Sequence, residues 1–177
     1  MSSLRASSWW SVSCASARSV RPAKIKVLTV GKSPDPGVQM LLDGYSRKIQ
    51  RYCGFQVVQV RPNPKNSSDP KVQIEAESEN AMRNISTSDW VAVLDENGRD
   101  VTSLELADLI ADAANNCSSS LLFCIGGPYG HGSRVKTRAN VTLRLSSLVL
   151  NHQVALIVLV EQIYRSWTIL RGEHYHH

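Results

Sequence analysis

One apolar run that ends in glycines constrains the fold of this chain more than any other feature. The run is Leu121–Ile125, and the loop Gly126-Gly127-Pro128-Tyr129-Gly130-His131-Gly132 follows it directly. A short apolar run bounded by turn residues is typical of a strand that is buried on both faces of a parallel sheet. Ligands of open α/β sheets bind beyond the carboxyl ends of such strands, and glycines let the backbone approach a ligand closely. A Gly-Gly pair alone is compatible with an ordinary turn, but four glycines in seven residues favour a binding loop.

Strands and helices are expected to alternate along the rest of the chain. Apolar and β-branched runs predict strands at residues 24–31, 55–60, 90–94, 121–125 and 148–150. Helical spacing of apolar residues predicts helices at 38–52, 102–113 and 154–170, and cap signals predict a weakly periodic helix at 71–84 and a short one at 133–139. This alternation predicts a three-layer α/β domain with a mostly parallel sheet, and we find no internal repeat or second domain.

Local signals indicate where several elements begin and end. Asp69 precedes Pro70 as an expected N-cap before a proline in the first helical turn. Thr102-Ser103-Leu104-Glu105 matches a capping box, and Ser133 is a candidate cap for the short helix after the glycine loop. Asp95–Gly98 is expected to be a polar turn that ends the third strand.

The positive charge of the chain comes almost entirely from its N-terminus. The 177 residues carry a formal net charge of +5, and no acidic residue precedes Asp35. Without the four basic residues that come first, 16 basic residues face 15 acidic ones; the four are Arg5, Arg18, Arg21 and Lys24. The charge of the domain therefore does not by itself argue for nucleic-acid binding, and any basic surface must be local.

Residues 1–23 have the composition of an organellar transit peptide, because they are rich in Ser, contain Arg and lack Asp and Glu. The Ser content favours a plastid over a mitochondrion; an extension without a targeting role is the alternative. Residues 24–177 are expected to form the domain, and no membrane partner is expected because the apolar run 154–160 is too short to cross a bilayer. The cysteines form no C-x-x-C pair and are expected to be reduced, packed thiols: Cys14, Cys53, Cys117 and Cys124.

Common nucleotide, hydrolase and metal motifs are absent from the sequence. It contains no G-x-x-x-x-G-K-[ST], no G-x-G-x-x-G after the first strand and no G-x-S-x-G. The C-terminal residues His174-Tyr175-His176-His177 lack Cys or Asp partners at metal-ligand spacing, so no metal is expected. Tyr and His side chains in such a tail can instead stack on an unpaired base and handle its proton.

Three segments, taken in order, carry a specific resemblance to a known family. They are Ile125-Gly126-Gly127-Pro128-Tyr129-Gly130, then Leu145–His152, then Val160–Trp167, and the terminal Tyr175-His176 follows them. In order, spacing and chain length the sequence resembles the ribosomal large subunit pseudouridine methyltransferase H family of the SPOUT class. The resemblance extends from about Ile25 to the C-terminus.

The resemblance implies a trefoil knot in the C-terminal part of the domain and a homodimer with active sites at its interface. It also implies S-adenosylmethionine as the cofactor, held in the knot by three loops. Carried over to this sequence, the cofactor contacts fall on nine residues: Leu94, Gly126, Gly127, Leu145, Ser146, Ser147, Leu148, Val149 and Leu150.

The reaction that the resemblance implies is methyl transfer to N3 of a pseudouridine in large-subunit ribosomal RNA. Candidates for contacting the base and its proton are Tyr175 and His176, with His152 nearby. Glu161 and Arg165, one helical turn apart, match family positions; they either orient the tail as an ion pair or act directly in catalysis. Because the domain is nearly neutral, an assembled ribosome is a more suitable substrate than naked RNA.

The chain departs from the family at its last residue. Related bacterial sequences have an arginine after the Tyr-His pair, where this chain has His177 and stops. Arginine is permanently charged and bidentate, whereas histidine is only partly charged near neutral pH. One alternative is therefore a ribosome-binding assembly factor that keeps the fold but has lost turnover. Another is a small-molecule enzyme that uses the glycine loop for a phosphate, although no nucleophile or acid pair accompanies that loop.

Overall fold

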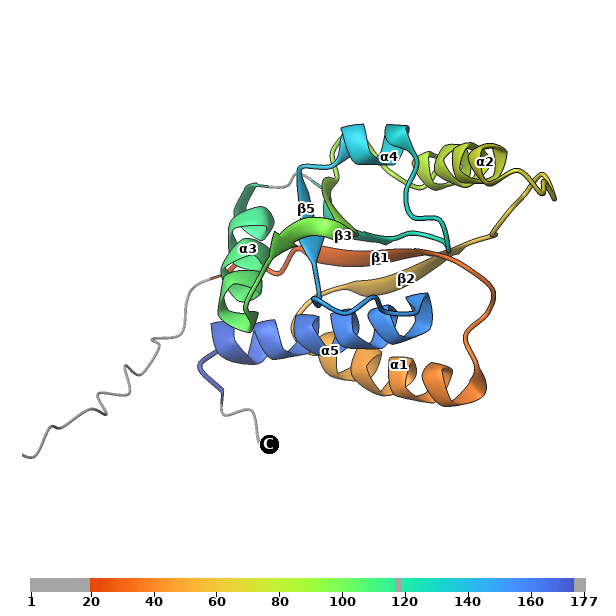
Figure 1. Ribbon diagram of the computed structural model, residues 1–177. Coiled ribbons are helices and arrows are strands. Elements are labelled where there is room, and N and C mark those ends of the chain that lie inside the picture. The colour runs from red at the N-terminus through yellow and green to blue at the C-terminus, as the bar shows by residue number, and fades with distance from the viewer. Residues whose placement is uncertain (1–19, 117–118, 174–177) are drawn as a thin grey trace, which may run out of the picture.

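Five parallel strands form a single sheet with the order β2-β1-β4-β3-β5. In the computed structural model, which describes residues 20–116 and 119–173, they are β1 (Lys24–Val30), β2 (Phe55–Val60), β3 (Trp90–Asp100), β4 (Ser120–Ile125) and β5 (Val141–Arg144). One face is covered by α1 (Pro36–Ile49), α3 (Ser103–Asn116) and α5 (His152–Leu170), and the other by α2 (Pro70–Met82) and α4 (Ser133–Arg138) (Figure 1). The predicted three-layer α/β class is confirmed.

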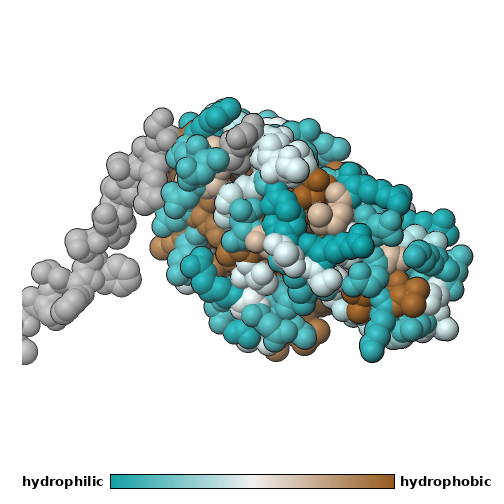
Figure 2. Space-filling model, turned by 90° about the horizontal axis from the view of Figure 1, so that it is seen from above, coloured by the Kyte–Doolittle hydropathy of each residue, from teal (hydrophilic) through white to brown (hydrophobic). Residues whose placement is uncertain are grey.

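The central strand β4 shows why its sequence is a continuous apolar run. Leu121, Phe123 and Ile125 join the core beneath α1, α3 and α5, whereas Leu122 and Cys124 join the smaller core beneath α2 and α4. Every residue of β4 is buried, since both faces of the sheet are covered by helices. Seen from the side of α2 and α4, hydrophobic residues form small, separate patches in a mostly hydrophilic surface (Figure 2).

Most predicted helix ends are confirmed by the hydrogen bonds of their caps. The carboxylate of Asp69 accepts from the Lys71 N–H at 2.9 Å. The Thr102 N–H donates to Glu105, and the Glu105 N–H donates to Thr102 Oγ1, which completes the capping box. The prediction for Ser133 is wrong, because Gly132 is the N-cap and Ser133 is already the first residue of α4.

The position predicted for the fifth strand is also wrong. The strand is Val141–Arg144, where Leu143 is fully buried beside β3, and residues 148–150 lie in the loop that follows. The side chains of Leu148 and Val149 are 73% and 85% exposed. An apolar run of three residues carries no period that distinguishes a strand from an exposed loop, and β3 already pairs with residues 141–144.

The third strand continues past its predicted end. Leu94 and Arg99 both pair with Leu143, so residues 95–98 bulge out of β3 before the pairing with β5 resumes. A Cβ on Gly98 would lie 2.4 Å from the carbonyl carbon of Leu143, so only glycine fits at the end of this bulge. The predicted polar turn is thus a bulge within a longer strand, and it projects over the carboxyl end of the sheet.

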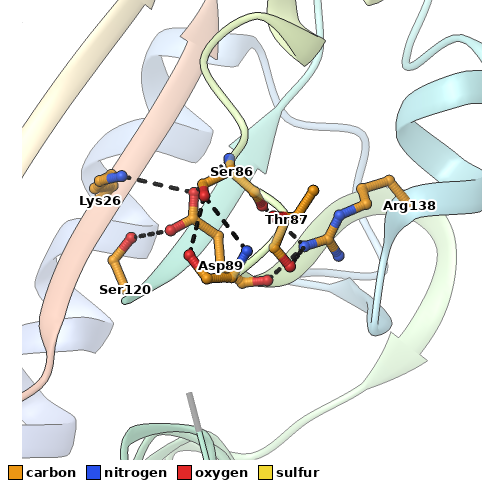
Figure 3. Close-up of polar contacts among 7 residues, drawn as sticks. Lys26, Ser86, Thr87, Asp89, Ser120 and Arg138 are labelled. Carbon is orange, nitrogen blue, oxygen red and sulfur yellow. Dashed lines mark hydrogen bonds and ion pairs between the residues drawn. The ribbon is translucent and has the colours of Figure 1, made fainter. Parts of the chain in front are cut away.

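A polar cluster ties the opposite end of the sheet together (Figure 3). The Asp89 carboxylate accepts from the Ser120 hydroxyl at the start of β4 and from the Ser86 N–H, and Lys26 Nζ of β1 lies 3.6 Å away. Arg138, at the end of α4, donates to the carbonyl oxygens of Ser86, Thr87 and Asp89. Burial raises the pKa of Asp89, but these hydrogen bonds and the Lys26 charge outweigh it and hold the pKa below its ordinary value.

The described cysteines are packed thiols. Cys53 and Cys124 are free and buried, and burial raises the pKa of Cys124 to about 12, so it stays protonated. Cys14 and Cys117 lie outside the described residues. Within residues 20–116 and 119–173, no helix is long and apolar enough to cross a membrane, and no group of His, Cys, Asp and Glu is placed to hold a metal ion.

Candidate active site

A cavity of about 450 Å³ opens beyond the carboxyl ends of β3, β4 and β5. Its walls come from the β3 bulge, from the glycine loop after β4 and from residues 144–150, which comprise the last residue of β5 and the loop that follows. Ala155 of α5 closes it on a fourth side. The volume falls in the range of about 300–1,000 Å³ that small-molecule sites occupy. Three segments that are distant in sequence therefore build one site at the edge of the sheet where ligands of α/β proteins bind.

The glycine loop makes a tight turn that only glycines permit. The Gly130 N–H donates to the Gly127 carbonyl oxygen at 3.0 Å, and Gly130 has a φ of +80°. A Cβ on Gly126 would lie 2.9 Å from the carbonyl carbon of Gly130. The turn thus brings bare backbone to the cavity wall, where its amides and carbonyls can face a ligand.

Eight of the nine residues expected to contact the cofactor line this cavity. They are Leu94, Gly126, Gly127, Leu145, Ser146, Leu148, Val149 and Leu150. Ser147 lies in the same loop but does not line the cavity. The structure therefore brings the expected residues together, and their contact with a cofactor stays a prediction.

The loop after β5 places apolar side chains at the rim of the cavity. The Leu148 N–H donates to Ser146 Oγ at 2.9 Å, which turns the chain and leaves Leu148 and Val149 facing outward. Exposed apolar side chains at the edge of a cavity favour a flat apolar group or a second protein surface as their partner.

Charged residues at the cavity were not recognised in the sequence as site residues. The Lys136 ammonium lies 2.8 Å from Asp95 Oδ2, and its hydrogen bond holds the pKa of the Asp95 carboxyl below its ordinary value. Glu96 also lines the cavity, and Arg144 does so while its Nε donates to Asp100 at 2.7 Å. The polar composition of residues 95–97 was the sequence feature that could have indicated a charged site. Whether these side chains face the cavity, however, depends on the bulge in β3.

His131 supports the glycine loop from behind. Its Nε2 lies 3.1 Å from the Cys124 carbonyl oxygen of β4, and its side chain is buried. Burial lowers the pKa of His131, so the ring is neutral at physiological pH. The ring thereby ties the loop to the end of the strand without placing a charge beneath the site.

The expected catalytic residues do not meet at this cavity. His152, the first residue of α5, lines a second cavity together with Gly31. Glu161 and Arg165 form an ion pair on α5 with a shortest N–O distance of 3.0 Å and line neither cavity. Their pairing fits an orienting role. Tyr175 and His176 lie outside the described residues.

Comparisons with known proteins give one consistent family. The family model described as predicted SPOUT methyltransferase matches residues 23–176. A provisionally named RNA methyltransferase of Arabidopsis thaliana is 54% identical over 160 residues, which cover 90% of this chain and 83% of that protein.

Bacterial relatives cover the same region of the chain. The ribosomal RNA large subunit methyltransferase H of Clostridium tetani is 35% identical over 156 residues, covering 86% of this chain and 98% of that protein. That of Flavobacterium johnsoniae is 34% identical over 155 residues, with the same coverage.

Among solved structures, the SpoU methyltransferase AviRb from Streptomyces viridochromogenes, in complex with AdoMet, matches with 15% identity and a TM-score of 0.44. The match covers 82% of this chain and 58% of that one. Because the family model spans most of the chain and the bacterial relatives are covered almost completely, this chain belongs to the SPOUT methyltransferase family.

Proposed function

We propose that this protein transfers a methyl group from S-adenosylmethionine to N3 of a pseudouridine in the large-subunit ribosomal RNA of an organellar ribosome. The observation that carries the proposal is the cavity itself, whose walls are the three segments on which the family places its cofactor contacts. The relatives named as large-subunit ribosomal RNA methyltransferases support the substrate class.

The residues of the cavity fit the chemical parts of S-adenosylmethionine. Leu145, Leu148 and Leu150 offer apolar surface for an adenine ring, and loop amides and carbonyls can satisfy its nitrogens. Backbone at Gly126 and Gly127 can lie against the methionine part, since no Cβ intervenes. The Glu96 carboxylate lines the cavity and supplies negative charge close to where a cationic cofactor would bind, whereas Asp95 is paired with Lys136.

The chemistry needs positioning and the removal of one proton. The cofactor supplies an electrophilic methyl group when it is bound. The protein has to hold the pseudouridine in line with that group and to receive the N3 proton. Tyr175, His176 and His152 are the candidate groups for the base and its proton, and the Glu161–Arg165 pair would orient the segment that carries the first two.

The length of the C-terminal tail supports a homodimer with shared active sites. Ala155, in the first turn of α5, lines the cavity, and the helix continues from there to Leu170, about 22 Å away at a rise of ~1.5 Å per residue. Five residues from Leu170 to Tyr175 reach at most ~18 Å even when fully extended. A tail that leaves the far end of α5 is therefore better placed to serve the cavity of a partner subunit than its own.

The path of the chain after β5 supports the expected knot. The segment 145–151 lines the cavity, and α5 then packs against α1 and α3 beneath the sheet (Figure 1). We expect this return to thread the C-terminal part through the loops at the cavity, as the resemblance implies; the trefoil knot stays a prediction.

The first 23 residues support delivery to an organelle, with a plastid favoured. Their Ser and Arg content and lack of acidic residues fit a transit peptide. A fusion of residues 1–23 to a fluorescent protein should enter isolated chloroplasts and lose the presequence there. Uptake by mitochondria alone would indicate a mitochondrial location instead. Uptake by neither organelle would contradict a targeting role for these residues.

Methylation of ribosomes tests the function directly. The full chain is incubated with radiolabelled S-adenosylmethionine and bacterial ribosomes that lack the modification, and the labelled nucleoside is identified. Label recovered as 3-methylpseudouridine in large-subunit RNA is the expected result. Comparing assembled ribosomes, free subunits and naked RNA then identifies the substrate form, for which we expect assembled ribosomes.

Two other results would change the proposal. Cofactor binding without methyl transfer favours the assembly-factor alternative, and His177→Arg then tests whether an arginine at the end of the tail restores turnover. A chain that does not bind S-adenosylmethionine at all contradicts the proposed function.

A further inference from the structure

We propose that a second cavity beside the first binds one unpaired nucleotide of the RNA substrate and that Lys32 and Arg61 hold its phosphate. The proposal rests on the proposed function, since it names a subsite for that RNA. The cavity measures about 700 Å³ and lies beyond the carboxyl ends of β1 and β2. Pro128 of the glycine loop lines both cavities. An occupant of the second cavity therefore lies next to the candidate cofactor site, separated only by that loop.

Two cations reach this cavity from adjacent strands. The Gly31 N–H donates to the Val60 carbonyl oxygen at 3.1 Å, so Lys32 and Arg61 leave neighbouring strands that lie ~4.8 Å apart. Both side chains are exposed, and neither forms an ion pair within residues 20–116 and 119–173. Two unpaired cations on adjacent strands are well suited to a phosphate group.

One carboxylate, that of Asp35, shares the lining with these cations and forms no ion pair with either of them within the described residues. Asp35 lines the cavity, but its Oδ2 accepts from Gln153 Nε2 at 3.3 Å. The Asp35 N–H in turn donates to Gln153 Oε1 at 2.9 Å, so the pair joins the start of α1 to the start of α5. Two cations against this one carboxylate leave the lining of the cavity with a net positive charge, which favours a phosphate.

His152 offers a polar atom that no described group satisfies. Its Nε2 is buried without a hydrogen-bond partner and packs against Gly31, where a Cβ would lie 3.0 Å away. A buried ring nitrogen without a partner is unfavourable, so a ligand that supplies one gains affinity. A nucleotide base that enters the cavity can supply that partner, and the amides of Asn66 and Gln73 in the same wall can contact base edges.

The wall of the cavity is held in place before any ligand arrives. Asn63 and Asn66 have φ values of 41° and 49°, in the left-handed region that few residues adopt without a reason. Asn63 Nδ2 donates to the Ser67 carbonyl oxygen, and the Ser67 N–H donates to Asn63 Oδ1. The Asn63 N–H also donates to Oε1 of the buried Glu77 at 2.8 Å. A wall braced in this way loses little entropy when a ligand binds.

The same carboxylate connects the two cavities. Glu77 Oε1 accepts from Gln73 Nε2 at 3.0 Å, in the wall of the second cavity. Its other oxygen, Oε2, would lie 2.7 Å from a Cβ on Gly127, in the wall of the first. The cavities therefore share a rigid partition, as expected if one RNA chain must place its target base against the cofactor and a neighbouring nucleotide alongside.

The double variant Lys32→Gln with Arg61→Gln tests the phosphate contact. The full chain is compared with a matched control, Arg47→Gln, because Arg47 is an exposed residue of α1 that lines neither cavity. We expect the ribosome KM and the dissociation constant in filter binding to rise about tenfold for the double variant, with a shallower salt dependence. The Kd for S-adenosylmethionine and the kcat should not change, and the control should match wild type.

The outcomes separate this inference from the function on which it rests. If wild type methylates ribosomes while the double variant binds them equally well, the subsite is wrong and the function stands. If wild type neither binds nor methylates ribosomes, the function itself fails. A fall in cofactor affinity equal to the loss of RNA affinity would also overturn the subsite, because the cations would then act on the first cavity.

The C-terminal carboxylate of a partner's tail is the competing occupant. Binding of uridine 5′-monophosphate to the full chain, and to a chain ending at Glu173, distinguishes the two. We expect equal affinities that fall in the Lys32→Gln/Arg61→Gln variant, and weaker binding of uridine, which lacks the phosphate. Tighter binding after removal of the tail would assign the cavity to the tail and overturn the proposal.

Discussion

The shape of the first cavity depends on the absence of a side chain at Gly126. A Cβ there would meet three backbone atoms of Gly130 at 2.9, 3.0 and 3.2 Å, and backbone cannot rotate away as a side chain can. We expect Gly126→Ala to open the turn, lower the affinity for S-adenosylmethionine at least about tenfold and cost about 1–3 kcal/mol of unfolding free energy. Calorimetric titration and urea denaturation measure the two effects.

Gly44→Ala is the matched control for that substitution. Gly44 lies inside α1, and nothing is found within 4 Å of its added Cβ. The control should leave cofactor affinity unchanged and raise stability by about 0.5–1 kcal/mol, since alanine is the better helix former. Equal cofactor affinity in wild type and Gly126→Ala would show that the glycine turn does not contribute to binding.

His131 makes stability depend on pH. Burial lowers its pKa, so the unfolded chain binds a proton more readily than the folded one. Stability then rises with pH wherever the unfolded state holds more protons; conversely, it falls as the pH drops from about 7 through the ordinary pKa of histidine near 6.5. Urea midpoints between pH 7.5 and 5.5 should show this slope, and His131→Gln should flatten it. An unchanged slope in the variant would assign it to other groups.

At the scale of elements, Asp89 joins the starts of β1, β3 and β4 (Figure 3). Asp89→Ala leaves the Ser120 hydroxyl and Lys26 without their acceptor inside the fold. We expect it to cost about 3 kcal/mol in urea denaturation. The exposed Glu79–Arg83 pair on α2 is the control, and Glu79→Ala should cost less than ~0.5 kcal/mol. Similar losses in the two variants would contradict a structural role for the Asp89 cluster.

The same scale shows which elements can be predicted from sequence. Four strands and the five helices are found near their expected positions, because Leu121–Ile125 is apolar throughout and the caps at Asp69 and Thr102 are local signals. β5 was missed because four residues at a sheet edge have too little pattern, and its pairing is with residues 92–94 and 99–100 of the distant strand β3. Local periodicity cannot indicate a pairing that depends on a distant segment.

Of the candidate site, too, one part could be predicted from the sequence and another part could not. The glycine loop and residues 145–150 were identified through the resemblance, and eight of nine expected residues line one cavity. Lys136, Arg144 and the buried Glu77 were missed, since charged residues on helices and edge strands are ordinarily solvated. Their positions follow from the pairing of β3 with β5 and from the packing of α2 and α4, which cannot be predicted from the local sequence.

At the scale of the whole molecule, a shared active site makes a clear prediction for mixed dimers. A chain ending at Glu173 lacks the tail, and Ala155→Trp fills the first cavity; each variant alone should be inactive. Random mixing after subunit exchange pairs half of the chains as heterodimers, in which one site has both an intact cavity and a partner tail. Activity should then recover to about one quarter of wild type.

No recovery in the mixture would mean that each tail serves its own cavity. Sedimentation of both variants should show dimers before mixing, which excludes a loss of assembly as the cause.

The first cavity has a consequence for how the chain is made. Its walls come from residues 94–97, 126–130 and 144–150, and Ala155 completes it, so a nascent chain whose β4 has emerged still has no place for the cofactor. S-adenosylmethionine therefore cannot seed folding during synthesis; it can only stabilise the finished domain, by an amount set by its concentration relative to its Kd. Saturating cofactor should accordingly slow unfolding and leave the rate of refolding unchanged.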